Sequence, residues 1–171
     1  MRVVAALLTM VGLLPGQTAN PHIKAALAAY QAGEAAQRDK QYQLAIDSLR
    51  QAIEIEPTFL EAYESLITAH LDSGNRLGAA TSITEFLEIR PEAVHYRVLL
   101  GQILLEQKQA ERALAQFSLA LQTDPYNADG LLGFAASARQ MGMEERAAQA
   151  IELGRKHYPS DERFKTFAGS H

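Results

Sequence analysis

The chain has 171 residues, enough for one solenoid or one compact domain, and a fold of this size needs no disulfide or metal ion to support its core. It contains no cysteine, which excludes disulfides, thiol catalysis and cysteine metal ligands. Its 16 Lys and Arg against 20 Asp and Glu give a net charge of -4 with no long run of one sign. We therefore expect no nucleic-acid partner, because phosphate binding requires a basic surface.

The first 19 residues have the layout of a secretory signal peptide. Arg2 precedes an apolar run from Val3 to Leu14, and the small residue Ala19 offers a cleavage position. As a helix this run would be about 18 Å long, too short for the ~30 Å hydrocarbon core of a bilayer. We expect residues 1–19 to be a signal peptide cleaved near Ala19, in a bacterial protein that is periplasmic or secreted and has no membrane span once the signal is removed. The alternative is an apolar helix docked on the first helix pair.

The rest of the chain is predicted to form a series of helix pairs. Asn20 and Pro21 are typical of an N-cap and a first-turn proline, and they predict a helix over 21–38. Apolar residues at helical spacing predict its partner over 42–56. Further helices follow, separated by glycine, asparagine or proline turns, at about 58–72, 76–90, 92–107 and 110–123, with a last pair that opens at Asp124, turns at Gly142 and closes near His157.

Prolines and alanines recur along the chain with a spacing of 34 residues. A fixed period of this length indicates stacked copies of one helix–turn–helix unit. The alanine allows the two helices of a unit to approach closely, and the proline prevents the second helix from continuing. The prolines are Pro57, Pro91, Pro125 and Pro159, and the alanines are Ala45, Ala79, Ala113 and Ala147.

This pattern resembles the tetratricopeptide repeat (TPR) family. The family's small residue in the first helix of a repeat is matched by Gly33, Gly101 and Ala135, and its second-helix alanine by the alanine series above. Ile67 and Phe86 depart from the pattern by filling slots that usually hold small residues. The resemblance implies an all-α fold, a right-handed superhelix (α-solenoid) of antiparallel helix pairs. It places four repeats within residues 20–159, at about 26–59, 60–93, 94–127 and 128–161.

Residues 160–171 are predicted to form a C-terminal capping helix and tail. A terminal repeat cannot cover its own apolar face, so a solenoid requires a cap. Ser160 or Asp161 would begin this short helix. Phe164 and Phe167 are three residues apart, which would place them on one helix face against the fourth repeat.

The sequence contains none of the common catalytic motifs. There is no glycine-rich nucleotide loop, nucleophile elbow, zinc-protease helix or calcium loop, and the histidines are isolated from one another. We therefore expect no enzyme, no metal site and no cofactor.

The resemblance implies a peptide-binding groove on the concave face, lined by first-helix residues. Six acids and a set of apolar side chains in these slots favour an apolar partner segment that carries Lys or Arg. The alternative is that the apolar residues pack between helices and the acids only keep the surface soluble. The expected groove residues are Tyr30, Glu34, Arg38, Glu61, Glu64, Leu71, Asp72, His95, Val98, Leu105, Glu106, Leu132 and Arg139. The wider set of slots adds Leu27, Gln37, Thr68, Gln102, Asp129, Ala136 and Gln140.

The sequence thus predicts a non-enzymatic, exported adaptor that binds a peptide or protein partner in this groove. The alternative is a structural, self-associating scaffold for envelope assembly that uses the convex face or the repeat ends. Neither the partner nor the oligomeric state follows from the sequence.

Overall fold

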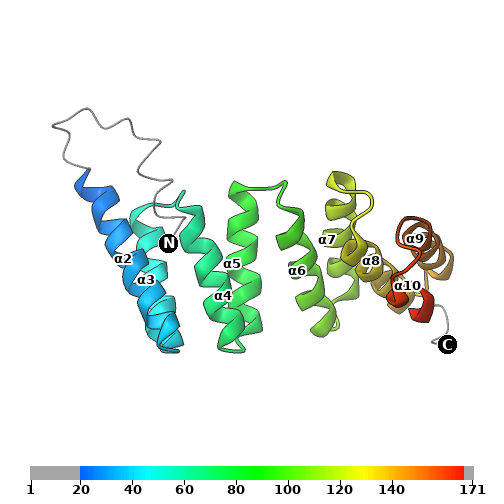
Figure 1. Ribbon diagram of the computed structural model, residues 1–171, viewed down its shortest axis with the longest axis horizontal. Helices are drawn as coiled ribbons and strands as arrows, with labels where there is room; N and C mark the ends of the chain where they lie inside the picture. The colour runs from blue at the N-terminus through cyan, green and yellow to red at the C-terminus, as the bar shows by residue number, and fades with distance from the viewer. Residues whose placement is uncertain (1–19, 168–171) are drawn as a thin grey trace. The chain divides into compact units, whose positions relative to one another are not determined.

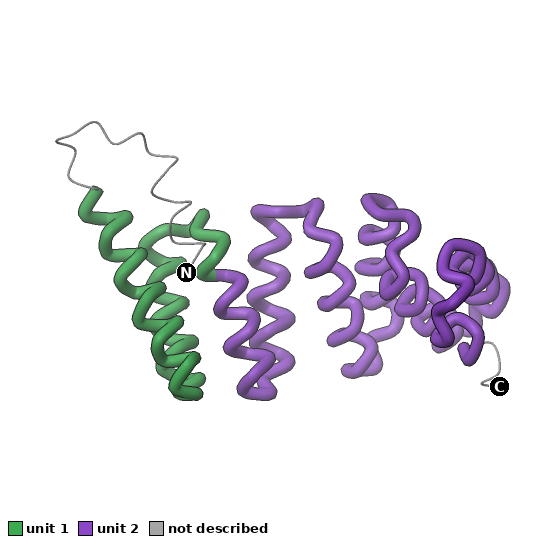
Figure 2. Tube along the Cα trace, viewed as in Figure 1, with its two compact units in different colours: residues 1–62 green, residues 63–171 purple. Residues whose placement is uncertain are grey.

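The computed structural model describes residues 20–167, and over this range the chain is all-α, with nine helices and no strand (Figure 1). The expected signal peptide, residues 1–19, lies outside the described residues, as do residues 168–171. The chain divides into two compact units, residues 1–62 and 63–171, and the division falls inside the third described helix (Figure 2). We describe each unit by itself.

The helices confirm the expected all-α series of helix pairs. One helix begins later than expected, at Val94 instead of Glu92, because the turn after Pro91 extends to the N-cap Ala93. The helices are α2 Pro21–Arg38, α3 Tyr42–Ile55, α4 Leu60–Asp72, α5 Arg76–Ile89, α6 Val94–Glu106, α7 Ala110–Thr123, α8 Ala128–Gln140, α9 Glu144–His157 and α10 Glu162–Thr166.

In the first unit, α2 packs against α3 through small residues. The Asn20 side chain accepts a hydrogen bond from the His22 amide and caps α2 at its start. A Cβ added to Gly33 would lie 2.6 Å from Leu49 Cγ, so only glycine allows this approach of the two helices. The Tyr30 and Phe59 rings also pack together within this unit, with centroids 5.0 Å apart.

In the second unit, α5 to α10 follow one another as packed neighbours. α6 packs on α5, α7 and α8, while α9 packs on α8 and α10. Asn127 and Asp161 cap α8 and α10 with their side chains, and these two N-caps are 34 residues apart. The helix α10 therefore stands in the sequence phase of the next first helix of the series.

The alanine series occupies the closest approaches between paired helices. The exposed fraction is 0% for Ala45, Ala79 and Ala113 and 1% for Ala147. A larger side chain at these positions would clash with the partner helix, which is the physical reason for the alanine period.

The turn inside each helix pair contains one residue in the left-handed region. These residues share the 34-residue period: Lys40 (φ 58), Gly74 (φ 76), Lys108 (φ 60) and Gly142 (φ 71). Glycine adopts this conformation readily, whereas a side chain makes it unfavourable. Two of the turns are thus chemically suited to the conformation and two are strained.

Phe117 of α7 holds α6 and α8 in register within the second unit. Its side chain is fully buried, and a Cβ added to Gly101 or Gly133 would lie 2.7 Å and 2.2 Å, respectively, from its Cζ. The ring therefore occupies the space that the two glycines leave on α6 and α8. This packing sets the surface that α6 and α8 present on their other side.

A chain of rings joins α4, α5 and α6. The Phe86 ring lies 6.3 Å from that of Tyr63 and 4.5 Å from that of Tyr96. One period later, the positions of Phe86 and Tyr96 are held by Ala120 and Gly130. Two large rings therefore fill the junction between α5 and α6, where the next junction uses two small residues.

The short helix α10 is anchored by one aromatic side chain. Phe164 is fully buried, and a Cβ on Gly154 would come within 2.0 Å of its ring. Arg155 Nε donates to the Phe164 carbonyl at 3.1 Å. Phe167 is half-buried and packs against the same α8–α9 core, so both phenylalanines lie against the fourth helix pair.

None of the described helices is both long and apolar enough to cross a bilayer. The described residues also contain no group of three or more His, Asp or Glu side chains arranged to hold a metal ion.

Candidate functional site

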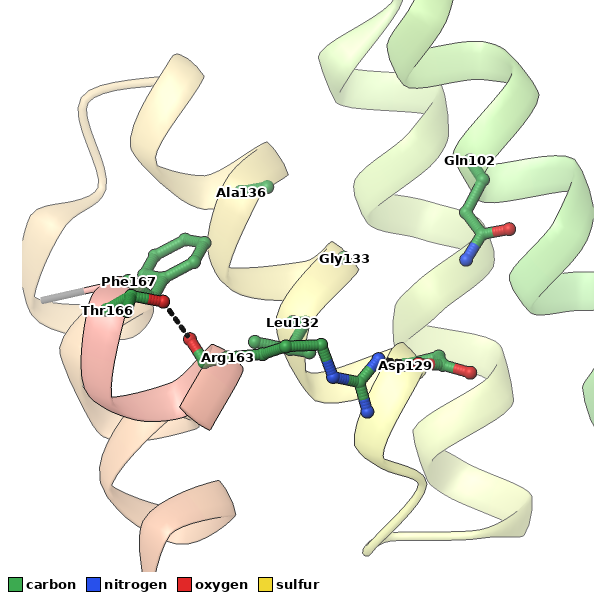
Figure 3. Close-up of a pocket in the computed structure, with 8 residues that line it drawn as sticks. All are labelled: Gln102, Asp129, Leu132, Gly133, Ala136, Arg163, Thr166 and Phe167. Carbon is green, nitrogen blue, oxygen red and sulfur yellow. Dashed lines mark hydrogen bonds and ion pairs between the residues drawn. The ribbon is translucent and has the colours of Figure 1, made fainter. Parts of the chain in front are cut away.

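A pocket of about 610 Å³ lies between α6, α8 and α10 in the second unit (Figure 3). Its floor is the surface of α8, where Gly133 and Ala136 leave room beside Leu132. Gln102 stands on α6 at one side, and α10 forms the opposite wall. The described residues that line the pocket are Gln102, Asp129, Leu132, Gly133, Ala136, Arg163, Thr166 and Phe167.

Arg163 connects the wall formed by α10 to the floor formed by α8. Its Nη1 donates to Asp129 Oδ1 at 2.6 Å and its Nη2 to Asp161 Oδ2 at 2.7 Å (Figure 3). Hydrogen bonds from the Arg163 side chain and backbone hold the pKa of Asp161 below its usual range. The same two carboxylates raise the pKa of Arg163 above its ordinary value. All three groups are therefore charged at neutral pH.

Arg139 holds Phe167 in place from the other end of α8. Its Nη2 donates to the Phe167 carbonyl at 3.2 Å, and its Cζ lies 4.4 Å from the centroid of the Phe167 ring. Glu144 forms a longer ion pair with the same guanidinium, at 3.7 Å. Arg139, which the sequence predicts as a groove residue, thus positions a wall of the pocket.

The pocket brings together several of the expected groove slots of the third and fourth repeats. Leu132 belongs to the expected groove residues, while Gln102, Asp129 and Ala136 belong to the wider set. Val98 is only 6% exposed and offers almost no surface to a ligand. Leu71 and Leu105 are half-buried, and Thr68, Asp72 and His95 are exposed.

Two of the acids expected to attract a basic partner already have partners of their own. Glu64 accepts a hydrogen bond from Tyr96. Burial, together with the Glu64 charge and this hydrogen bond, raises the pKa of Tyr96 to about 12. Glu106 pairs with Arg76 at 3.4 Å, and both side chains are about half exposed. The charge that these acids present to a ligand is correspondingly reduced.

The expected groove residues of the first unit are half-buried or exposed. Tyr30, Glu34 and Glu61 are half-buried, and Arg38 is exposed at the end of α2. The Tyr30 ring contacts Phe59, so part of its surface is used in packing within the unit. No pocket is described within this unit.

Sequence reasoning misses the contribution of α10 to the pocket. Arg163, Thr166 and Phe167 belong to the segment expected only to cap the solenoid. The period contains a usable signal, because Arg163 is 34 residues after Asp129 and therefore in phase with it on the next first helix. A pair of opposite charges one period apart predicts a contact between neighbouring first helices.

Comparison with known proteins assigns the family. Three tetratricopeptide repeat models match residues 26–59, 65–128 and 104–169. Together with the helix pairs, the buried alanine series and the period of 34 residues, these matches place the chain in the tetratricopeptide repeat family.

Two relatives match part of the chain. Human tetratricopeptide repeat protein 6 is 28% identical over 122 residues, which is 70% of this chain and 24% of the relative. A TPR-containing protein of Dictyostelium discoideum is 33% identical over 78 residues, 44% of this chain and 6% of the relative. The chain therefore spans less than a quarter of the length of each.

Solved structures confirm the fold. The crystal structure of YrrB, described as a TPR protein with an unusual peptide-binding site, has a TM-score of 0.71 at 19% identity, covering 85% of this chain and 75% of YrrB. A MamA crystal structure has a TM-score of 0.66 at 13% identity, covering 78% and 73%. MamA residues 41 to the end from Desulfovibrio magneticus RS-1 give 0.63 at 17%, covering 80% and 77%.

Proposed function

We propose that this chain is a non-enzymatic adaptor that binds a peptide or protein segment, and that the pocket between α6, α8 and α10 is its main binding site. The observation that carries the proposal is the pocket itself. Its floor and one wall are apolar or small, with Leu132, Ala136 and Phe167, while Gln102 and Arg163 place polar groups at its edge. This combination is typical of a binding site, in which apolar surface provides affinity and a few polar groups fix orientation.

The family supports the same function. TPR proteins generally bind other proteins or peptides and carry out no catalysis themselves. YrrB is described as having a peptide-binding site, and its likeness to this chain extends to the fold. In this chain an apolar side chain of the partner would lie over Ala136, and the Gln102 amide would hydrogen-bond the partner's backbone.

Site-specific photo-crosslinking tests this function. A photoreactive residue at Gln102, inside the pocket, should capture a partner in cells, whereas one at Ala115, exposed on α7, should not. Ala136→Phe should abolish the capture at Gln102, because the ring fills the pocket. Equal capture at both positions, or capture unaffected by Ala136→Phe, would contradict the proposal.

We also propose that residues 1–19 direct export. The basic Arg2, the apolar run and the small residue Ala19 support this, and Asn20 immediately precedes α2 as its N-cap. Mass spectrometry of the protein produced in a bacterial host should find a mature form that begins at Asn20 in the periplasm or medium. Intact residues 1–19 on protein retained in the cytoplasm would contradict export.

Light scattering addresses the alternative of a self-associating scaffold. We expect a molar mass that is independent of concentration, since an adaptor requires no second copy. A mass that rises with concentration in the absence of any partner would favour the scaffold.

A further inference from the structure

The charges around the pocket form a cluster with an excess of acid. Asp129 and Asp161 both bind the single guanidinium of Arg163. Among the described residues that line the pocket, Arg163 is the only cation and Asp129 the only anion, and Asp161 stands directly behind them. Two carboxylates share one guanidinium, so the cluster has a net charge of about -1 at neutral pH.

The nearby cations are already engaged. Arg163 bonds both of its carboxylates through Nε, Nη1 and Nη2. Arg139 binds the carbonyl and the ring of Phe167 and pairs with Glu144. An acidic ligand would therefore have to displace existing bonds, whereas a basic ligand meets an uncompensated negative charge.

Asp129 can accept a second cation. The bond from Arg163 engages its Oδ1, the side chain is 53% exposed, and within the described residues its Oδ2 makes no hydrogen bond or ion pair. A carboxylate has room for donors on both oxygens. Asp129 lies at the rim of the pocket, one helical turn from Leu132 and Gly133 on the same helix (Figure 3).

The remaining lining favours an apolar side chain. Thr166 uses its hydroxyl on the carbonyls of Glu162 and Arg163 in its own helix. Phe167 is held in position by Arg139, and Ala136 has no side chain beyond Cβ that could fill the space. A ligand therefore meets a fixed apolar wall with an acid at one edge.

We infer that the pocket selects a peptide in which a large aliphatic or aromatic residue, seated against Leu132, Ala136 and Phe167, is followed or preceded closely by a lysine or arginine that pairs with Asp129. This inference rests on the proposed function and specifies the partner class. A neutral apolar peptide would bind less tightly, and an acidic one least.

Selection from a phage-displayed library of random peptides tests this specificity. On the wild-type protein, the enriched peptides should combine Leu, Phe or Met with a nearby Lys or Arg. On Asp129→Asn the apolar residue should persist and the basic residue should lose its enrichment. A synthetic peptide from the wild-type selection should bind Asp129→Asn about two- to fivefold more weakly, as expected for an exposed ion pair, and the difference should vanish at high salt.

Two control variants separate the possible causes. Glu111→Gln removes one negative charge from the exposed start of α7, away from the pocket, and should leave peptide selection unchanged. Asp161→Asn releases the other bond to Arg163 while keeping Asp129, so a basic preference that persists there shows that Asp129 is the recognising group. Loss of the preference in Asp161→Asn to the same extent would overturn the assignment to Asp129.

The outcomes distinguish this inference from the proposed function. If no peptide is enriched, or if enriched peptides bind Ala136→Phe as well as wild type, the pocket is not the binding site and the proposed function fails. If binding is lost in Ala136→Phe but the peptides show no basic residue, only the charge inference fails. If the wild-type protein is a dimer that Ala136→Phe converts to a monomer, the occupant is a second copy of the chain and the inference is overturned.

Discussion

Phe117 shows how single residues determine the surface of the second unit. Its ring lies where side chains would stand on two other helices, at Gly101 of α6 and Gly133 of α8. Any side chain at these glycines must displace a ring that is fully buried. The pocket floor on α8 therefore depends on a contact on the opposite side of the same helix.

Gly133→Ala should destabilise the protein by about 1–3 kcal/mol, although alanine is the better helix former. The new Cβ would lie 2.2 Å from Phe117 Cζ, and Gly101 prevents the ring from moving away. Urea denaturation followed by circular dichroism measures the loss. Phe117→Leu should lessen the effect of Gly133→Ala, because leucine lacks the clashing atoms. Gly130→Ala is the matched control, since its nearest neighbour is the flexible end of Leu121 at 3.2 Å. An equal loss in both alanine variants would contradict the steric explanation.

Tyr96 links the ring cluster at the α5–α6 junction to the acid Glu64. Burial is the largest cause of its raised pKa, followed by the charge and the hydrogen bond of Glu64. The folded protein therefore holds the phenolic proton more tightly than the unfolded chain does. The resulting stability is fully present below the ordinary pKa of 10.0 and is lost as the pH rises from there to about 12.

Ultraviolet absorbance of the phenolate, compared between wild type and Tyr96→Phe, should reveal one tyrosine that titrates near pH 12. Glu64→Gln should lower the pKa of Tyr96 without restoring its ordinary value, because burial remains. A Tyr96 titration that is normal in the wild type, or unchanged in Glu64→Gln, would show that the acid does not act on it.

At the scale of helices, the turns between paired helices show uneven use of one conformation. All four turns contain a residue with φ between 58 and 76, but only two of these residues are glycine. A lysine in this region is unfavourable by about 1–2 kcal/mol relative to a right-handed conformation. Lys40 and Lys108 are therefore positions where the chain is less stable than its fold allows.

Lys108→Gly should stabilise the protein by about 0.5–1 kcal/mol, since relief of the strain is partly offset by the greater flexibility of glycine in the unfolded chain. Thermal denaturation should show a higher midpoint. Gly142→Ala is the reciprocal control. It should lower the midpoint through the backbone alone, because no atom lies within 4 Å of the added Cβ. Destabilisation by Lys108→Gly would indicate that the lysine side chain makes a contact that outweighs the strain.

At the scale of the whole chain, most of the fold follows from sequence periodicity. Ala45 and Ala147 are predicted and found at closest approaches between helices, because only a small residue fits there in every copy. The helix ends follow from proline and glycine, whose backbone preferences are local. These features repeat, so an error in one copy is corrected by the others.

The candidate site follows less well from the sequence, because it lies where the repetition stops. Leu132 and Ala136 are assigned by their phase, but Phe167 and Arg163 have no counterpart in a complete repeat. Their role depends on how far α10 extends and on which carboxylate the Arg163 side chain reaches. Likewise, Val98 occupies a groove slot by phase, yet its burial is decided by the bulk of its neighbours.

A stacked fold should respond locally to damage, because each helix pair packs on its neighbours in the sequence. Ala147 is buried in α9, which packs on α8 and α10. Ala147→Leu should overpack this contact and accelerate amide hydrogen exchange in α8, α9 and α10, while exchange in α2 and α3 stays at the wild-type rate. Ala45→Leu should produce the reverse pattern, since Ala45 is equally buried in α3 of the first unit. Hydrogen exchange read by mass spectrometry resolves the two patterns. Uniform acceleration along the chain in either variant would mean that the two units unfold together, and the local response would be excluded.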